Sequence, residues 1–250
     1  MRIVSLCPSL TELVFALGRG PELVGITDWC VHPKPDVDAV EKVGGTKNPK
    51  VARIVELAPD IVLMNDEENR FEDASALQQA GVRISSSLPR TLAETAEMVR
   101  SIGAALDARG PAEAIALDIE RRAERVRTAA LAARPVRFAY LIWRKPWMSV
   151  SRDTFASRML ELAGGVNVFG DARSRYPAIE PAALGAADPE LVLLCTEPFP
   201  FKPEHADELA RESGVARERI RIADGEYLSW HGSRTPDGID YAARLIEDAR

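Results

Sequence analysis

Four tryptophans follow short apolar runs, and large flat rings at such places suit ligand binding. The runs and their rings are residues 23–26 before Trp29, residues 138–142 before Trp143 and Trp147, and residues 220–223 before Trp230. Each run is typical of a buried strand, so we expect the rings at the carboxyl ends of strands, where open α/β sheets bind ligands. Several rings at one edge predict a wide, flat, partly apolar ligand held by stacking. The alternative is that each ring only closes a loop onto a core.

Two other motifs bring polar groups to the same kind of position. Pro8 and Ser9 follow the first strand pattern and open a helix, whose free backbone amides could hold a polar or anionic group of a ligand. The alternative for this motif is a plain helix cap. Arg144 lies between Trp143 and Trp147 and could meet acidic side groups of a ligand or stack on a ring. The alternative for Arg144 is a solvated charge in an exposed loop.

Metal and enzyme motifs are largely missing from the chain. Cys30 and His32 are two residues apart and both can ligate a metal, but no third ligand is near them in sequence. The sequence does not decide whether Cys30 or His32 ligates a metal. The alternative is that both side chains only pack within a loop. The three cysteines are scattered and predict no disulfide framework. Without a Gly-rich phosphate loop, a nucleophile elbow or a zinc-protease histidine pair, the sequence predicts no enzyme and no catalytic residue. A carboxylate-based hydrolase is not excluded by these patterns.

Composition limits the class of protein. The chain has 250 residues, of which 46% are hydrophobic, and a net charge of -6. The length suits one large or two small lobes, and the acidic balance argues against nucleic acid as a partner. No apolar run is long enough to span a bilayer. Met1 leads directly into a strand pattern without a leader, so we expect either a cytoplasmic protein or an extracytoplasmic one whose leader was removed.

Strand and helix patterns alternate in two blocks. They predict an N-terminal α/β lobe over residues 1–106 and a C-terminal α/β lobe over residues 136–250, each with a parallel sheet. A helix over residues 111–133, within the connecting segment 107–135, begins at a proline and would be roughly 35 Å long. The predicted fold is therefore two Rossmann-like lobes joined by a long rigid backbone helix, with a ligand cleft between the lobes.

A short repeat supports this division. Residues 57–64 (LAPDIVLM) resemble residues 187–194 (ADPELVLL): in both, a Pro-acid turn leads into an apolar strand and then into an acidic loop. Repeated units of this kind indicate two lobes of similar structure.

The chain as a whole resembles the helical-backbone metal receptors, which are class III periplasmic-type substrate-binding proteins, and in particular their cobalamin-binding branch. The segments that carry the resemblance, in order, are residues 3–13, 43–45, 54–62, 160–169 and 230–236. The resemblance implies a receptor with two α/β lobes that binds cobalamin, haem or an iron-siderophore and delivers it to the permease of an ABC importer. We also expect a monomer that is not inserted in the membrane.

Site residues follow from the resemblance together with the motifs above. Trp29 and Trp230 fall where relatives have aromatic ligand contacts, whereas Asn65 and Ser86 stand where the best-known cobalamin binder has further tryptophans. Trp143 and Trp147 could compensate from the second lobe. The predicted ligand-binding residues are Trp29, Trp143, Trp147, Trp230, Pro8, Ser9, Arg144, Tyr176 and His231.

The predicted function is the binding of a corrinoid, without a covalently bound cofactor, and its delivery to an importer. The resemblance implies one surface acid on each lobe that docks on the importer, and Glu72 and Glu204 are the candidates. The alternative is that these acids are ordinary solvated charges. One alternative function is an iron-siderophore or haem receptor of the same fold. Another is a cytoplasmic corrinoid salvage protein or enzyme on the same scaffold.

Overall fold

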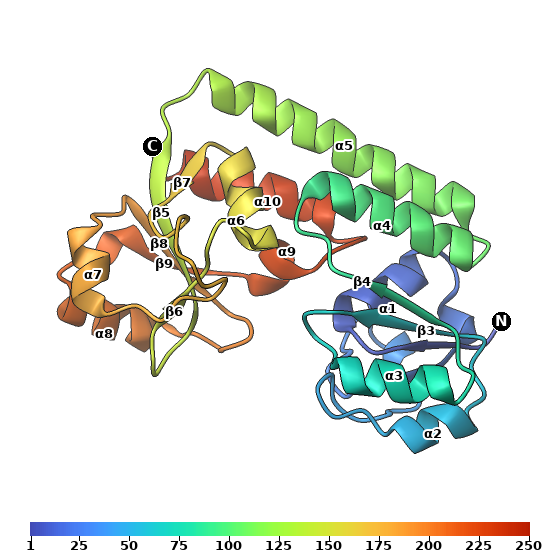
Figure 1. Cartoon of the computed structure of the whole chain (residues 1–250). Coiled ribbons are helices and arrows are strands. Elements are labelled where there is room, and N and C mark those ends of the chain that lie inside the picture. Colours follow the sequence, from blue (N-terminus) through green and yellow to red (C-terminus); the bar gives the residue numbers. More distant parts are fainter. The chain divides into compact units, whose positions relative to one another are not determined.

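The computed structural model describes all residues 1–250, and the chain forms two compact units. The first unit comprises Met1–Pro89, Ala93–Asp118 and His231–Arg234, and the second comprises Arg90–Leu92, Ile119–Trp230 and Thr235–Arg250. The longest helix, α5 (Arg109–Leu131, light green in Figure 1), gives its first part to the first unit and the rest to the second. The lobe boundaries 1–106, 107–135 and 136–250 and a ligand cleft between the lobes stay predictions.

The first unit is built on a parallel sheet with strand order β2-β1-β3-β4. Its strands are β1 (Ile3–Ser5), β2 (Leu23–Ile26), β3 (Ile61–Asn65) and β4 (Ile84–Ser87). Its helices are α1 (Pro8–Ala16), α2 (Val51–Glu56), α3 (Phe71–Gln79) and α4 (Leu92–Ala105), with short 3-10 turns at Gly20–Glu22 and Asp36–Ala39. Figure 1 shows α2 and α3 along one face of the sheet, where Ile54 and Leu77 pack against Val62. Ile3 and Ile61 point to the other face and are also fully buried, as expected for a parallel sheet covered on both sides.

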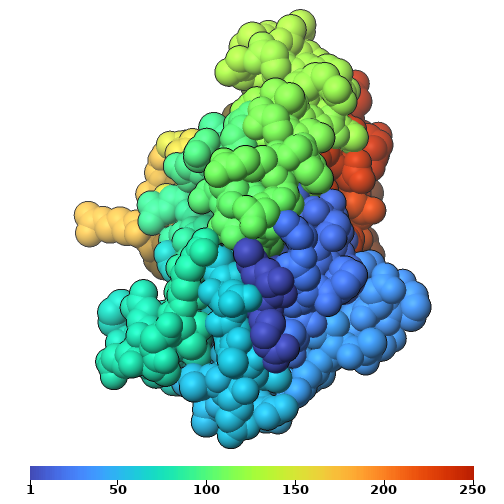
Figure 2. Space-filling model, turned by 90° about the vertical axis from the view of Figure 1, so that its right-hand side faces the viewer, coloured from blue at the N-terminus to red at the C-terminus, as the bar shows by residue number.

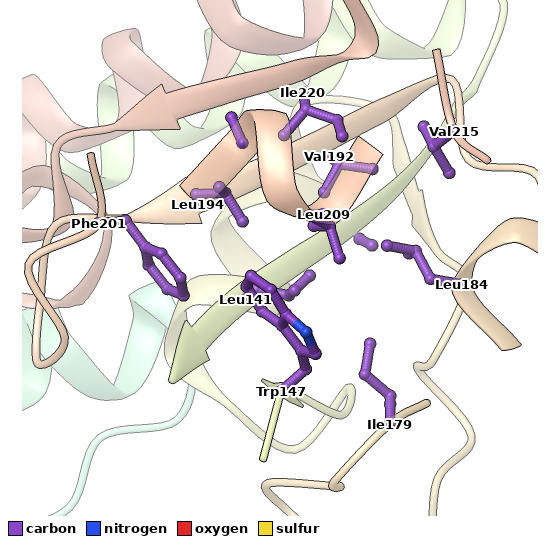
Figure 3. Packing of buried hydrophobic residues seen from close by; sticks show 12 residues of the cluster. Leu141, Trp147, Ile179, Leu184, Val192, Leu194, Phe201, Leu209, Val215 and Ile220 are labelled. Carbon is purple, nitrogen blue, oxygen red and sulfur yellow. The ribbon is translucent and has the colours of Figure 1, made fainter. Parts of the chain in front are cut away.

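The second unit has a sheet with strand order β6-β5-β8-β9, and β7 also pairs with β5. Its strands are β5 (Val136–Trp143), β6 (Met148–Ser149), β7 (Gly165–Asn167), β8 (Leu191–Cys195) and β9 (Ile220–Ala223), and all pairings except that of β6 are parallel. Its helices are α6 (Phe155–Leu162), α7 (Pro181–Ala186), α8 (Pro203–Ser213), α9 (Gly225–Ser229) and α10 (Thr235–Glu247), with a 3-10 turn at Arg217–Arg219. Figure 3 shows one core of this unit, in which Leu184 of α7 and Leu209 of α8 pack on the sheet residues Leu141, Val192 and Leu194.

The sequence repeat is a structural repeat. In the first unit the Asp60 carboxylate accepts the backbone amide of Arg2 at 2.6 Å, and the Arg2 guanidinium donates to the carbonyl of Leu57, the last residue before the Pro-acid turn. The same two contacts recur in the second unit, where the Glu190 carboxylate accepts the Arg137 amide and the Arg137 guanidinium donates to the Ala187 carbonyl. The prediction of two similar α/β lobes with parallel sheets is therefore confirmed, and α3 and α8 occupy equivalent places.

Most predicted elements are present, with local corrections. The predicted helix 111–133 is α5 at Arg109–Leu131, so it begins two residues earlier and ends two residues earlier than expected. The short elements β6, β7 and α9 were not predicted. Because α9 follows β9, Trp230 lies beyond a helix and not directly beyond a strand, while Trp143 is the last residue of β5 itself.

The surface of the first unit includes the start of the chain. The N-terminal residues, dark blue in Figure 2, lie on the face that this view shows, and the Met1 amino group is 3.4 Å from the Glu22 carboxylate. No helix of the chain combines the length and the apolar character that crossing a membrane requires.

Candidate ligand-binding site

Trp29 is a strongly exposed aromatic residue at the carboxyl edge of the first sheet. It lies in the loop after β2, and 65% of its surface is exposed. The loop is held against a glycine turn, because the Asp28 amide donates to the Gly44 carbonyl at 2.9 Å and Gly44 has a φ of 97°. A Cβ on Gly45 would lie 3.4 Å from the indole nitrogen of Trp29 and 2.4 Å from the Asn48 side chain. The two glycines therefore let the backbone approach closely while the indole ring stays open to solvent.

The start of α1 lies at the same edge, since α1 directly follows β1. Cys7 is its N-cap residue, and no side chain caps the helix, so the plain-cap interpretation of this motif is wrong. The Ser9 hydroxyl instead pairs with the Cys7 thiol at 3.3 Å, and Ser9 is buried. Pro8 has no amide proton, and the Ser9 amide belongs to the first turn, where helix geometry provides no carbonyl partner. This amide is the polar group that α1 can offer a ligand.

Cys30 packs as a core residue of the first unit. Its thiol lies 3.0 Å from the Thr11 hydroxyl and 3.1 Å from the Thr27 hydroxyl, and burial raises its pKa. Burial likewise raises the pKa of the Cys7 thiol to about 12. Neutral thiols are poor metal ligands, because the thiolate is the ligating form. No three side chains of His, Cys, Asp or Glu gather in an arrangement that could hold a metal ion.

The loop after β3 is positioned by one buried amide that the sequence analysis missed. The Asn69 side-chain nitrogen donates to the carbonyls of Leu6 and Thr46, at 2.9 and 3.0 Å, and its oxygen accepts the Asn65 amide. Asn69 therefore ties together the segments that follow β1 and β3 and the glycine turn beside Trp29. No local sequence signal marks this role, because its partners are far away along the chain.

The carboxyl edge of the second sheet carries an aromatic cluster. Trp143, at the end of β5, is 41% exposed and meets Phe199 edge to face, with ring centroids 5.7 Å apart. Phe199 lies 4.7 Å from Phe201, and His205 of α8 packs against both phenylalanine rings. The segment Pro198-Phe199-Pro200-Phe201 was the missed signal, because it places two rings in the loop after the strand β8.

Trp147 lies inside the second unit, with 7% of its surface exposed. Its ring stacks on Phe201 at 5.9 Å, and its indole nitrogen donates to the Glu212 carboxylate at 3.0 Å. Figure 3 shows Trp147 among the apolar residues of the core, near Leu141 and Ile179. Trp147 is thus largely buried, because the short turn after β5 folds its ring back onto the sheet, and its contact with a ligand stays a prediction.

Arg144 and Trp230 both have acidic partners in the second unit. The Arg144 guanidinium lies 2.5 Å from the Glu208 carboxylate, and this ion pair lowers the pKa of Glu208. The Trp230 indole nitrogen donates to Glu197 at 2.8 Å, and the residue is 7% exposed. The charge of Arg144 is thus already balanced, and the Trp230 ring is held largely buried.

Tyr176 and His231 complete the predicted set. Tyr176 is half-buried in a segment alongside β6, where the Ser149 amide donates to the Pro177 carbonyl at 2.9 Å. His231 is buried in a short stretch of the first unit. In that stretch Arg234 makes a two-pronged ion pair with Glu12 of α1, at 2.6 and 2.9 Å.

The predicted ligand residues are therefore divided between the units. The first unit holds Trp29, Pro8, Ser9 and His231, and the second holds Trp143, Trp147, Trp230, Arg144 and Tyr176. That they meet around one ligand stays a prediction. The two predicted docking acids are equivalent in the repeat: Glu72 is the second residue of α3, Glu204 is the second residue of α8, and both are exposed.

Comparison with known proteins places this arrangement in a family. Residues 3–219 match the family model described as "Periplasmic binding protein". The chain belongs to the periplasmic binding protein family. The match covers the first sheet, all strands of the second sheet except β9, and most of the candidate site residues, and the predicted resemblance is confirmed at this level.

Individual relatives of this periplasmic binding protein differ in the ligands they are named for. The vitamin B12-binding protein of Vibrio cholerae is 24% identical over 257 residues, covering 100% of this chain and 90% of the relative. A crystal structure with that description has a TM-score of 0.85 and covers 99% of this chain and 97% of its own. The periplasmic haem-binding protein RhuT of Roseiflexus sp. RS-1 has a TM-score of 0.86 at 24% identity, covering 100% of this chain and 99% of its own.

A third relative bears on transport. An uncharacterised ABC transporter substrate-binding lipoprotein of Bacillus subtilis, YvrC, is 26% identical over 253 residues, covering 98% of this chain and 79% of the relative. The structural similarities, with 24% identity, establish the two-lobed fold alone. The family is one of binding proteins and not of enzymes.

Proposed function

We propose that this protein is the substrate-binding component of an ABC-type importer and that its ligand is a corrinoid of the cobalamin type. Membership of the periplasmic binding protein family and the names of the Vibrio and Bacillus relatives support the transport role. The observation that carries the ligand proposal is Trp29, a large ring left 65% exposed at the carboxyl edge of the first sheet. Trp143 is a second exposed ring at the corresponding edge of the second sheet.

The chemistry of these two edges suits a broad, mostly neutral ligand. Exposed indole rings offer flat apolar faces that a macrocycle can cover, and burying such rings provides most of the affinity in many sites. The Ser9 amide at the start of α1 can donate to a carbonyl on the rim of the ligand. A corrin ring carries amide side groups on its rim, so its polar contacts are of this neutral kind.

A haem or iron-siderophore ligand is the second candidate, and the similarity to RhuT favours it. Haem carries two carboxylates, which are usually met by cations. Arg144, the cation predicted for this role, is already paired with Glu208. A carboxylate ligand would have to compete with Glu208, whereas an amide-bearing corrinoid would not, and this contrast is why we place the corrinoid first.

Titration calorimetry with separate ligands tests the proposal. We expect cyanocobalamin and cobinamide to bind with micromolar or tighter affinity, and haemin and a ferric siderophore to bind more weakly. No heat with either corrinoid and saturable binding of haemin would replace the first candidate by the second. Binding of none of the four would reject the proposed ligand class as a whole.

The transport role needs its own test, because a cytoplasmic salvage protein could bind the same ligand. We propose that Glu72 and Glu204 dock on cationic side chains of the importer. The double variant Glu72→Gln and Glu204→Gln should bind the corrinoid as the wild type does but should no longer stimulate the ATPase of the reconstituted importer. Equal stimulation by the wild type and the double variant would contradict this role for the two acids.

A further inference from the structure

The most exposed aromatic side chain of the protein is not among the predicted ligand-binding residues. Phe71, the first residue of α3, is 82% exposed, which exceeds the 65% of Trp29. A single exposed apolar residue is common on protein surfaces and needs no explanation by itself. Phe71 differs from such residues in its surroundings and in its place in the repeat.

The surroundings of Phe71 are strongly acidic. Residues 66–73 contain five carboxylates and one guanidinium, and that guanidinium, on Arg70, pairs with Asp73 at 3.2 Å. The other carboxylates of this segment belong to Asp66, Glu67, Glu68 and Glu72, so five negative charges face one positive charge within it. A neighbouring lysine, Lys47, donates to the Glu67 carbonyl. The exposed ring of Phe71 is thus surrounded by more negative than positive charges, and a basic surface on a partner would complement them.

The repeat shows that this combination occurs in one lobe alone. α8 is equivalent to α3 and also has an exposed glutamate, Glu204, as its second residue. Its first residue is Pro203, where α3 has Phe71. The acid is therefore common to both lobes, whereas the large exposed ring is particular to the first.

We propose that Phe71 is an apolar anchor for the importer, inserted beside Glu72 into a pocket of the permease that has an apolar floor and a cationic rim. This inference rests on the proposed transport function and adds to it a contact that differs between the two lobes. A ring surrounded by rim charges is the usual arrangement of a binding hot spot, in which the ring provides affinity and the charges provide orientation.

Crosslinking identifies the partner first. The photoreactive residue p-benzoylphenylalanine is placed at position 71, and in a control protein at position 131, because Leu131 is similarly exposed at 84%. Each protein, loaded with cyanocobalamin, is irradiated with membrane vesicles of the native host. We expect position 71 to crosslink to the permease and position 131 not to. The absence of any crosslink between position 71 and the permease would overturn the proposal.

Affinity for the purified importer in nanodiscs then tests the energetics. Phe71→Ala should weaken binding about tenfold, on the scale of a hot-spot ring, and Phe71→Leu should weaken it less. Leu131→Ala should have no effect. Raising the salt concentration should shrink the loss caused by Glu72→Gln, because salt screens exposed charges, and should leave the loss caused by Phe71→Ala unchanged. Unchanged importer affinity for Phe71→Ala would overturn the proposal.

Ligand titration separates this inference from the proposed function. Phe71→Ala should bind cyanocobalamin as tightly as the wild type. A weakened corrinoid affinity would show that Phe71 contacts the ligand and would also overturn the anchor. If the wild type binds no corrinoid at all, the proposed ligand fails, and the crosslink and the importer affinity still decide the role of Phe71.

Discussion

Single residues with similar sequence contexts end in different environments. Trp29 and Trp143 are 65% and 41% exposed, whereas Trp147 and Trp230 are each 7% exposed and donate to Glu212 and Glu197. All four follow apolar runs, so the pattern predicts that a ring comes near a strand end but not which way it turns. The direction is set by the turns and by distant acidic partners, which the local sequence does not show.

The tryptophans give a paired prediction. Trp29→Ala should weaken ligand binding by about 2 kcal/mol, roughly thirtyfold, and leave the thermal midpoint unchanged, because the ring contributes to no core. Trp147→Ala should instead lower the free energy of unfolding by about 3–5 kcal/mol, the scale for removing a buried ring. Calorimetry for affinity and scanning fluorimetry for the midpoint measure both effects. A large loss of midpoint in Trp29→Ala would show that its ring is part of the core.

Glu190 gives a prediction of pH dependence. The Arg137 amide and the Arg134 guanidinium both donate to its carboxylate and hold its pKa below the ordinary value. A depressed pKa in the folded state stabilises the protein above the ordinary glutamate pKa of about 4.3, and this contribution is lost as the pH falls through the folded value.

The variant Glu190→Gln should therefore lower the free energy of unfolding by about 1 kcal/mol at pH 7 and have a much smaller effect near pH 3. Urea unfolding of the wild type and the variant at both pH values measures this difference. Glu218→Gln, at an exposed position of the same unit, is the control and should be neutral. An equal loss at both pH values would show that the carboxylate charge is not what matters.

At the scale of elements, the close packing of α4 against α5 explains why residue 103 is a glycine. Gly103 lies in α4, where an added Cβ would be 2.1 Å from the Cβ of Ala112 in α5. The absence of a side chain thus lets the two helices of the first unit approach closely. Arg100 and Glu113 add an ion pair between the same helices, at 2.9 and 3.0 Å.

Gly103→Ala should destabilise the protein by about 1 kcal/mol, because the overpacking cost exceeds the gain of about 1 kcal/mol in helix propensity. Gly110→Ala is the matched control: an added Cβ there meets nothing within 4 Å, so this variant should be neutral or stabilising. Adding Ala112→Gly to Gly103→Ala should restore part of the loss. Stabilisation by Gly103→Ala alone would show that the helices separate at little cost.

For the whole molecule, the sequence predicted the order of the larger elements and the family because these depend on local signals. Apolar runs, prolines and glycines mark strands and helix ends, and the Pro-acid turns at Pro59 and Pro189 show the repeat. Strands of two or three residues, such as β6 and β7, are too short to show a period. The Arg234–Glu12 ion pair joins residues 222 positions apart, and no local pattern could indicate it.

The last prediction concerns α5, the long backbone helix that contributes to both units. Its second half is held to α10 in the second unit, where Arg122 donates to Asp237 and Asp240 at 2.9 and 2.6 Å. Replacing Ala123 and Glu124 by glycine should cost about 2 kcal/mol from helix propensity alone. If α5 acts as a rigid connection, the radius of gyration of the wild type should change little when the ligand binds. The double glycine variant should instead show a wider distribution of radii of gyration, both with and without the ligand. Small-angle scattering measures both, and a contraction of several ångströms in the wild type would show a hinge in place of a rigid connection.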